Sequence, residues 1–152
     1  MRDKMPVEYT ERSLLKYSQQ IIELFRNPKN VGEMENPTVT AIEGDPTCGD
    51  MMQMFLKIED DKIVDAKFLS FGCAANIATG SMVTEMVKGK TVDEAEKISI
   101  KEVSNNLGGL PMLKMHCAVL AYKTLKKAIQ EYRQMKAKSE VPKTPAQGQK
   151  DG

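Results

Sequence analysis

The first periodic segment of the chain predicts an amphipathic helix. Its apolar residues are three or four positions apart: Leu14, Tyr17, Ile21 and Leu24. This spacing places them on one face of a helix over residues 13–27, with Ser13 as its N-cap. A residue that precedes proline avoids the helical conformation, so Asn27 and Pro28 should end the helix. Residues 1–12 are polar and are expected to form a flexible N-terminus, and residues 28–37 are expected to form a loop.

The next segments predict a small antiparallel sheet. Strands are expected over residues 38–43, 51–58 and 62–71, and the last two are rich in Phe, Ile, Val and Leu. The polar run from Glu59 to Asp61 separates these two segments and favours a hairpin turn. Three antiparallel strands can expose one face to water while helices cover the other face.

Helices are expected in the rest of the chain. Residues 74–88 predict one that ends at Gly89, a residue suited to a left-handed C-cap. Two short helices should follow, each begun by a capping-box pair: Thr91 with Glu94, and Ser99 with Glu102. Residues 105–111 contain glycine and favour a loop.

A long helix over residues 116–136 completes the predicted fold. Its core-facing residues follow helical spacing: Cys117, Leu120, Thr124 and Ala128. We therefore expect an α+β fold, with a three-stranded antiparallel sheet packed on one face by helices and a long C-terminal helix. The domain should span residues 13–137. Residues 138–152 include two Pro, two Gly and no aromatic residue, which favours a disordered tail.

Composition narrows the class of protein. The 152 residues include 22 Lys and Arg against 21 Asp and Glu, so the formal net charge of +1 gives no support to nucleic-acid binding. The longest uncharged stretch, residues 68–84, is too short and too polar for a membrane span. The amino terminus lacks the apolar core of a secretory signal. Three widely spaced Cys do not suggest a disulfide framework, and we expect a cytoplasmic protein with thiol or metal chemistry.

The scarce reactive residues all fall at predicted element junctions. Cys48 lies between the first two strands, Cys73 lies where the third strand meets a helix, and Cys117 follows the sole histidine, His116, at the start of the long helix. Helix N-termini stabilise thiolates, the form of cysteine that binds metal or attacks sulfur. Asp50 follows Cys48 by two positions, so both side chains should point the same way if that segment is extended.

Each of these residues also has an ordinary structural interpretation. Taken singly, a cysteine is often a small buried residue, and His116 or Asp50 often caps a helix or a turn. Their joint placement favours a shared site. The sequence contains no CxxC, GxGxxG or GxxxxGK[ST] motif, which excludes common zinc, redox and nucleotide sites. A dyad of His116 with Cys117 is not expected, because adjacent helical residues diverge.

Four motifs in order resemble the IscU/NifU-type iron–sulfur cluster assembly scaffolds. These motifs are Gly44-Asp45-Pro46-Thr47-Cys48-Gly49-Asp50, Phe71-Gly72-Cys73, the segment Val83 to Thr91, and Leu110-Pro111-Met112-Leu113-Lys114-Met115-His116-Cys117. The similarity covers about residues 13–133. It implies the α+β scaffold fold (SufE/NifU-like) and a [2Fe–2S] cluster that is built transiently from iron and persulfide sulfur.

The resemblance also implies a ligand set and a set of partners. The ligands carried over by position are Cys48, Asp50, Cys73, His116 and Cys117. Cys117 would also accept persulfide sulfur, with Lys114 as an accessory residue at the site. The implied partners are a cysteine desulfurase and acceptor apoproteins, with a ferredoxin electron donor and an iron-regulating partner as further candidates. The same site would hold zinc in the resting form.

Two departures and one count refine these expectations. The chaperone-recognised segment of the family reads Leu-Pro-Pro-Val-Lys, but here Met112 replaces the second proline, which argues against dependence on a dedicated chaperone. After Cys73 the chain reads Ala-Ala-Asn where bacterial scaffolds have Gly-Ser-Ala. A [2Fe–2S] cluster needs four ligands, and three Cys leave at least one place for Asp50 or His116.

A labile cluster is the expected consequence, because a carboxylate is a poor match for sulfur-bridged iron. We therefore expect a non-enzymatic scaffold that assembles a cluster and transfers it to acceptors. Two alternatives use the same thiols. One is a zinc-binding persulfide carrier that builds no cluster, and the other is an adaptor in which zinc only stabilises the fold.

Overall fold

The computed structural model describes residues 17–45, 49–110 and 112–140. Its centre is an antiparallel sheet of three strands in the order β1-β2-β3. The strands are β1 (Val39–Asp45), β2 (Asp50–Glu59) and β3 (Lys62–Phe71). The hairpin between β2 and β3 turns at Asp60 and Asp61, which both have positive φ angles. The hairpin turn predicted from the polar run at residues 59–61 is confirmed.

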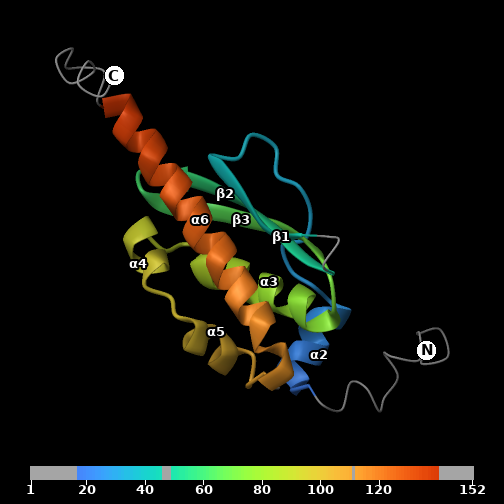
Figure 1. The fold of residues 1–152 in the computed structure, drawn as a ribbon. Coiled ribbons are helices and arrows are strands. Elements are labelled where there is room, and N and C mark those ends of the chain that lie inside the picture. The colour runs from blue at the N-terminus through green and yellow to red at the C-terminus, as the bar shows by residue number, and fades with distance from the viewer. Residues whose placement is uncertain (1–16, 46–48, 111, 141–152) are drawn as a thin grey trace.

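The described part of the chain contains five α-helices and one short 3-10 turn. The α-helices are α2 (Gln19–Arg26), α3 (Ala74–Val87), α4 (Val92–Glu96), α5 (Ile100–Asn106) and α6 (Met115–Glu140), and the 3-10 turn is η4 (Met112–Lys114). Figure 1 shows α3 and α6 lying across the same side of the sheet, with α6 extending beyond it toward the C-terminus. The expected α+β fold with a long C-terminal helix is confirmed.

Two predicted boundaries differ from the structure. The first helix begins at Gln19, and Ser18 is its N-cap, since the Ser18 hydroxyl accepts a hydrogen bond from the Ile21 amide at 3.1 Å. Ser13, the expected cap, lies outside the described residues. Both serines have the same local propensity, but Ser18 also donates to the Leu107 carbonyl, a long-range contact that spacing does not reveal.

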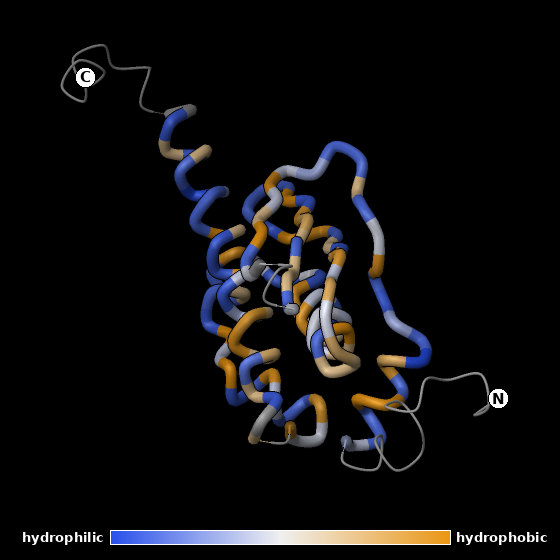
Figure 2. The backbone as a smooth tube through the Cα atoms, turned by 45° about the vertical axis from the view of Figure 1, so that its right-hand side comes forward, coloured by the Kyte–Doolittle hydropathy of each residue, from blue (hydrophilic) through white to orange (hydrophobic). Residues whose placement is uncertain are grey.

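The long helix differs at its far end. α6 continues to Glu140, past the domain boundary expected at residue 137. Residues 141–152 of the expected disordered tail lie outside the described residues, as do residues 1–12. Figure 2 shows that the last turns of α6 are mainly hydrophilic, which agrees with their exposure to solvent.

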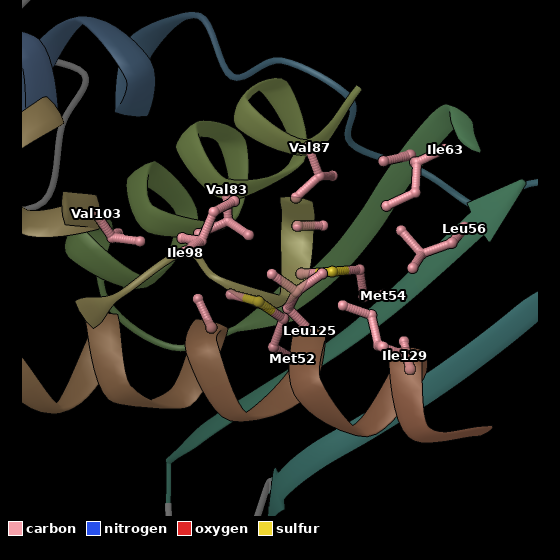
Figure 3. Packing of buried hydrophobic residues seen from close by; sticks show 14 of the residues in the cluster. Met52, Met54, Leu56, Ile63, Val83, Val87, Ile98, Val103, Leu125 and Ile129 are labelled. Carbon is pink, nitrogen blue, oxygen red and sulfur yellow. The ribbon is translucent and has the colours of Figure 1, made fainter. Parts of the chain in front are cut away.

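The hydrophobic core lies between the sheet and the two large helices. Strand β2 contributes Met52, Met54 and Leu56, and α6 contributes Leu125 and Ile129, all nearly inaccessible to solvent. Figure 3 shows these side chains meeting residues of α3 from the opposite side. The alternation of buried and exposed positions along β2 therefore aims one face of the sheet at the helices.

Helix α3 packs unusually close to β3. A Cβ atom on Gly80 would lie 2.4–2.9 Å from ring atoms of Phe68, which is itself 1% exposed. Only glycine lets the helix backbone rest directly on this ring. Ten of the 14 residues of α3 are buried, so the helix is central to the fold, and Glu85 is its one exposed residue.

The two edges of the sheet differ in how they are covered, since β3 bonds to neighbouring backbone and β1 receives a side-chain contact. On β3, the Phe68 amide donates to the Asn30 carbonyl, and the Ile63 amide donates to the Lys90 carbonyl. On β1, the Lys127 ammonium of α6 donates to the Ile42 carbonyl at 3.0 Å. None of the helices among the described residues has the length and apolar character that crossing a membrane requires.

Charged contacts fasten the outer end of α6. Arg133 donates to the carboxylates of Asp93 and Glu96 at 2.8 and 2.7 Å, which ties α4 to α6. Tyr132 and Lys136 both donate to Asp61 in the β2–β3 turn. These contacts hold the end of the helix that lies away from the predicted site residues.

Substituting Gly80 with Ala tests the close approach of α3 to β3. A Gly→Ala change inside a helix ordinarily raises the free energy of unfolding by about 1 kcal/mol. Here the added methyl group would meet the Phe68 ring, so Gly80→Ala should lower it by about 1–3 kcal/mol in urea denaturation. Adding Phe68→Leu to this variant should recover part of the loss. A Gly80→Ala protein that is more stable than the wild type would contradict the proposed packing constraint.

Candidate functional site

The predicted site residues converge at one end of the sheet because β2, α3 and α6 begin there and β3 ends there. Asp50 is the first residue of β2, and its neighbour Met51 pairs with Phe71, the last residue of β3. Two residues after Phe71, Cys73 forms the N-cap of α3. The first turn of α6, which carries His116 and Cys117, packs over this end of the sheet.

Four side chains form a continuous chain of contacts. The Sγ atoms of Cys73 and Cys117 are 3.6 Å apart, although the residues are 44 positions apart in sequence. The Cys117 Sγ is also 3.6 Å from the Nε2 atom of His116. The same Nε2 atom lies 3.0 Å from the Oδ2 atom of Asp50. The structure therefore brings together Asp50, Cys73, His116 and Cys117.

The remaining expected ligand, Cys48, lies outside the described residues. Gly49 lies in a turn with a φ of +100°, so the chain before Asp50 does not meet the condition of an extended segment at that residue. Lys114 is half-buried in η4, and its charge lowers the pKa of both thiols. It therefore lies near the sulfur atoms, as its position in the motif implied.

The contact between His116 and Cys117 corrects the expectation that these neighbours diverge. Both residues lie in the first turn of α6, and the imidazole bends toward Asp50 and passes the thiol at 3.6 Å. Helical spacing predicts only the directions of the two Cβ atoms. The imidazole is long enough to turn back toward the neighbouring thiol in the first turn of the helix.

Gly72 lets the Asp50 carboxylate reach its position. A Cβ atom on Gly72 would lie 2.2 Å from Asp50 Oδ1 and 3.2 Å from the Gly49 carbonyl oxygen. Its φ of +147° also disfavours other residues. Gly72 is therefore part of the site, because any side chain there would displace Asp50.

Asn76 and Thr79 support the site from within the core, and sequence reasoning did not assign them this role. The Asn76 Nδ2 atom donates to the Ser70 hydroxyl at 2.8 Å and to the Phe71 carbonyl at 3.2 Å, which fixes the end of β3. The Thr79 hydroxyl donates to the Cys117 carbonyl at 3.5 Å and so links α3 to α6. Their signal was polarity within an otherwise apolar, uncharged segment.

The two thiols have opposite protonation preferences. The hydrogen bond from Cys117 is the main cause that lowers the pKa of Cys73 to about 5, and the amides of Asn76 and Ala75 add to the effect. The same hydrogen bond, together with burial, raises the pKa of Cys117. Cys73 is therefore the thiolate of the pair, and Cys117 holds the shared proton.

Access to the site is unequal among its members. Cys117 is fully buried, whereas Cys73 is partly exposed. The side chains of His116 and Asp50 are 51% and 29% exposed. A shallow groove of about 360 Å³ runs beside His116 and Asp50 toward Glu43 and Lys123. Among the described side chains that contact Cys117, those of Cys73 and His116 are therefore the more accessible to a reactant.

The donor set suits iron or zinc, since it combines soft thiols with an imidazole and a carboxylate. No group of three or more Cys, His, Asp or Glu side chains among the described residues is arranged so that it could hold a metal ion. The donors contact one another instead. Binding of a metal would have to replace these contacts.

Comparison with known proteins decides the family. The family model for the NifU-like N-terminal domain matches residues 16–139. The chain belongs to the NifU-like N-terminal domain family.

Relatives within this NifU-like family carry consistent names. The chain is 50% identical over 116 residues to a protein of Archaeoglobus fulgidus named iron–sulfur cluster assembly scaffold protein IscU 1, with 76% of each chain covered. It is 42% identical over 122 residues to the iron–sulfur cluster assembly scaffold protein IscU of Rickettsia prowazekii, with 78% of this chain and 92% of that protein covered. The resemblance stated from the four motifs is confirmed.

A solved structure agrees with the NifU-like fold. A crystal structure from Fervidobacterium islandicum, described as an iron–sulfur cluster assembly scaffold for the SUF system, matches with a TM-score of 0.63 and 29% identity. The match covers 77% of this chain and 98% of that chain. The sheet and the long helix that position the site are therefore shared with a relative.

The lowered pKa of Cys73 predicts a distinctive pH dependence of its reactivity. In metal-free protein, Cys73 should remain a thiolate, and react with iodoacetamide, at pH values above about 5, whereas an ordinary cysteine has a pKa of 9.0. Its reactivity should disappear as the pH falls through its own pKa. Peptide mapping by mass spectrometry across this pH range measures the rate at Cys73.

The matched variant removes the main cause of the shift. In Cys117→Ala, the Cys73 thiolate loses its hydrogen bond, so the midpoint of the alkylation profile should move toward 9.0. A wild-type midpoint already close to that value would contradict the assignment of Cys73 as the ionised thiol.

Proposed function

We propose that this protein is a scaffold on which a transient [2Fe–2S] cluster is assembled from iron and persulfide sulfur and then transferred to acceptor apoproteins. The observation that carries this proposal is the convergence of two thiols, an imidazole and a carboxylate, within contacts of 3.0–3.6 Å, at the junction of three elements. The names of the most similar relatives support the same function.

The proposed ligands for the cluster are Cys48, Cys73 and Cys117, with Asp50 or His116 completing the set. The hydrogen bond between Asp50 and His116 makes these two residues competitors, since a group that binds iron must give up its contact with the other. A carboxylate holds sulfur-bridged iron less firmly than a thiolate does, so this position is where the cluster would be exchanged.

The remaining steps require partners, and the chain supplies the positions. A cysteine desulfurase would provide the persulfide, with Cys117 as the acceptor thiol and Lys114 beside it. A ferredoxin would provide electrons, and an iron-regulating partner would control the supply of metal. The chain itself would act as a carrier of ligands and not as an enzyme, without dependence on a dedicated chaperone, and would hold zinc at rest. Reduced thiols are maintained in the cytoplasm, where we place it.

Anaerobic reconstitution tests the proposed function directly. The purified chain with ferrous iron, cysteine and a cysteine desulfurase should develop the visible absorption of an iron–sulfur cluster. A zinc-binding persulfide carrier would take up sulfur under the same conditions without developing this absorption. The names of the relatives favour the scaffold over this alternative. Sulfur uptake without cluster absorption would contradict the scaffold function.

Replacing Asp50 with Ala should lengthen the lifetime of the cluster. The substitution removes the exchangeable oxygen and frees His116 from its 3.0 Å contact, so that a firmer nitrogen ligand becomes available. Loss of visible absorbance after reconstitution should slow on the order of tenfold. The control is Glu43→Gln, which removes a different carboxylate from the same groove. Faster or unchanged cluster loss in Asp50→Ala would contradict the role of Asp50.

Replacing Cys117 with Ser should abolish uptake of persulfide sulfur, because the acceptor sulfur atom is removed. Mass spectrometry of the chain after incubation with desulfurase and cysteine measures the adduct. The matched control is Cys73→Ser, which alters the contacting thiol and should still take up sulfur. A normal adduct on Cys117→Ser would mean that Cys48 or Cys73 is the acceptor.

A further inference from the structure

The contact between Cys73 and Cys117 has a chemical use beyond metal binding. Their sulfur atoms are 3.6 Å apart, one at the N-cap of α3 and the other in the first turn of α6. A disulfide requires the two sulfur atoms to approach to about 2.05 Å. Rotation of the two side chains and a small shift at the two helix ends would close this distance.

We propose that Cys73 and Cys117 act as an internal dithiol that reduces a persulfide on either residue to sulfide and becomes a disulfide. This inference rests on the proposed function, which brings sulfur to the site as a persulfide. The pair thereby provides the oxidation state of sulfur that an iron–sulfur cluster contains. Both residues would then act as reductants of the persulfide as well as ligands of the cluster.

The step is a thiol–disulfide exchange and is balanced in atoms and electrons. The thiolate of one residue attacks the sulfur atom that is bonded to Cβ of the persulfidated residue. A sulfur–sulfur bond forms between the two cysteines, the bond to the outer sulfur breaks, and that sulfur leaves as hydrosulfide with the electron pair. The outer sulfur is reduced by two electrons, and the two cysteine sulfurs together supply them.

Burial favours this internal reaction over attack by a thiol from solution. Cys117 is fully buried, and its sulfur contacts the Cys73 sulfur. Cys73 is therefore already in place to react, whereas a thiol from solution would first have to enter the site. Proximity of this kind replaces a bimolecular encounter with a unimolecular step. The ammonium group of Lys114, which acts on both sulfur atoms, would also stabilise the departing hydrosulfide anion.

Release of sulfide and binding of iron by these two cysteines would then occur in alternation. Once the disulfide forms, neither sulfur can act as a thiolate ligand until an external dithiol, or an electron carrier that delivers two electrons, opens it again. Iron could then bind to the regenerated thiols. The reductant would therefore act on a protein disulfide, after the sulfide has been released.

The experiment follows the mass of the chain and the release of sulfide together. Metal-free wild-type chain is incubated anaerobically with a cysteine desulfurase and cysteine, the desulfurase and excess cysteine are removed, and samples are trapped with N-ethylmaleimide over time. The wild type should first gain one sulfur atom and then change to a form that lacks two hydrogen atoms, with the release of sulfide. Peptide mapping should identify a Cys73–Cys117 disulfide.

Two variants isolate the pair. Cys73→Ser should keep the added sulfur on Cys117 and should lose the release of sulfide. The control is Glu59→Gln at the far end of β2, which leaves the pair intact and should behave as the wild type does. Peptide mapping of the wild type also shows whether a Cys73–Cys117 disulfide forms. The inference can therefore be tested even if Cys73→Ser folds poorly.

Each result bears on a different claim. A wild type that retains its added sulfur for as long as Cys73→Ser does, or a disulfide that involves Cys48, would overturn the inference. A failure of every variant to gain sulfur from the desulfurase would count against the proposed function instead. In that case, loading with glutathione persulfide tests the dithiol by itself, through the same masses and the same peptide map.

Discussion

Where α3 crosses β3, a helix backbone lies directly against an aromatic ring. Gly80 permits this contact with Phe68, and it sets how close α3 lies to the sheet. Helix α6 packs against α3 and against the other two strands, so its first turn is positioned from the same contact. The meeting of Cys73 with Cys117, at the N-terminal ends of these two helices, follows from this spacing.

The donor atoms of the site are held by contacts with one another. Asp50 contacts His116, His116 contacts Cys117, and Cys117 contacts Cys73. Such a chain satisfies the polar groups while no metal is bound, and under the proposed function each link would be exchanged for a bond to iron. The protonation of the thiol pair has the same origin, because one sulfur donates to the other. The same contacts therefore stabilise the metal-free site and hold the donor atoms close together for the proposed binding of a metal.

The sequence predicted the helices and strands far better than it predicted the contacts between them. Strand alternation and capping pairs are local, and Thr91 with Glu94 forms the full capping box in the structure. The 3.6 Å contact between Cys73 and Cys117 depends on the packing of α3 and α6, which spacing does not encode. The placement of these residues at element junctions and the resemblance to a family both predicted one shared site, but neither gave the contact between the two sulfur atoms. The support from Asn76 was missed because a buried amide becomes informative only when its partners are known.

The covered outer side of β3 limits how another chain could pair with this sheet. An edge strand with free amide and carbonyl groups invites another chain to pair with it, and that is how sheets grow into aggregates. Here residues 30–32 and 89–91 bond to the outer side of β3, while Lys127 places a charge at the Ile42 carbonyl of β1. Addition of another strand at β3 is thereby blocked along the residues that these two segments cover.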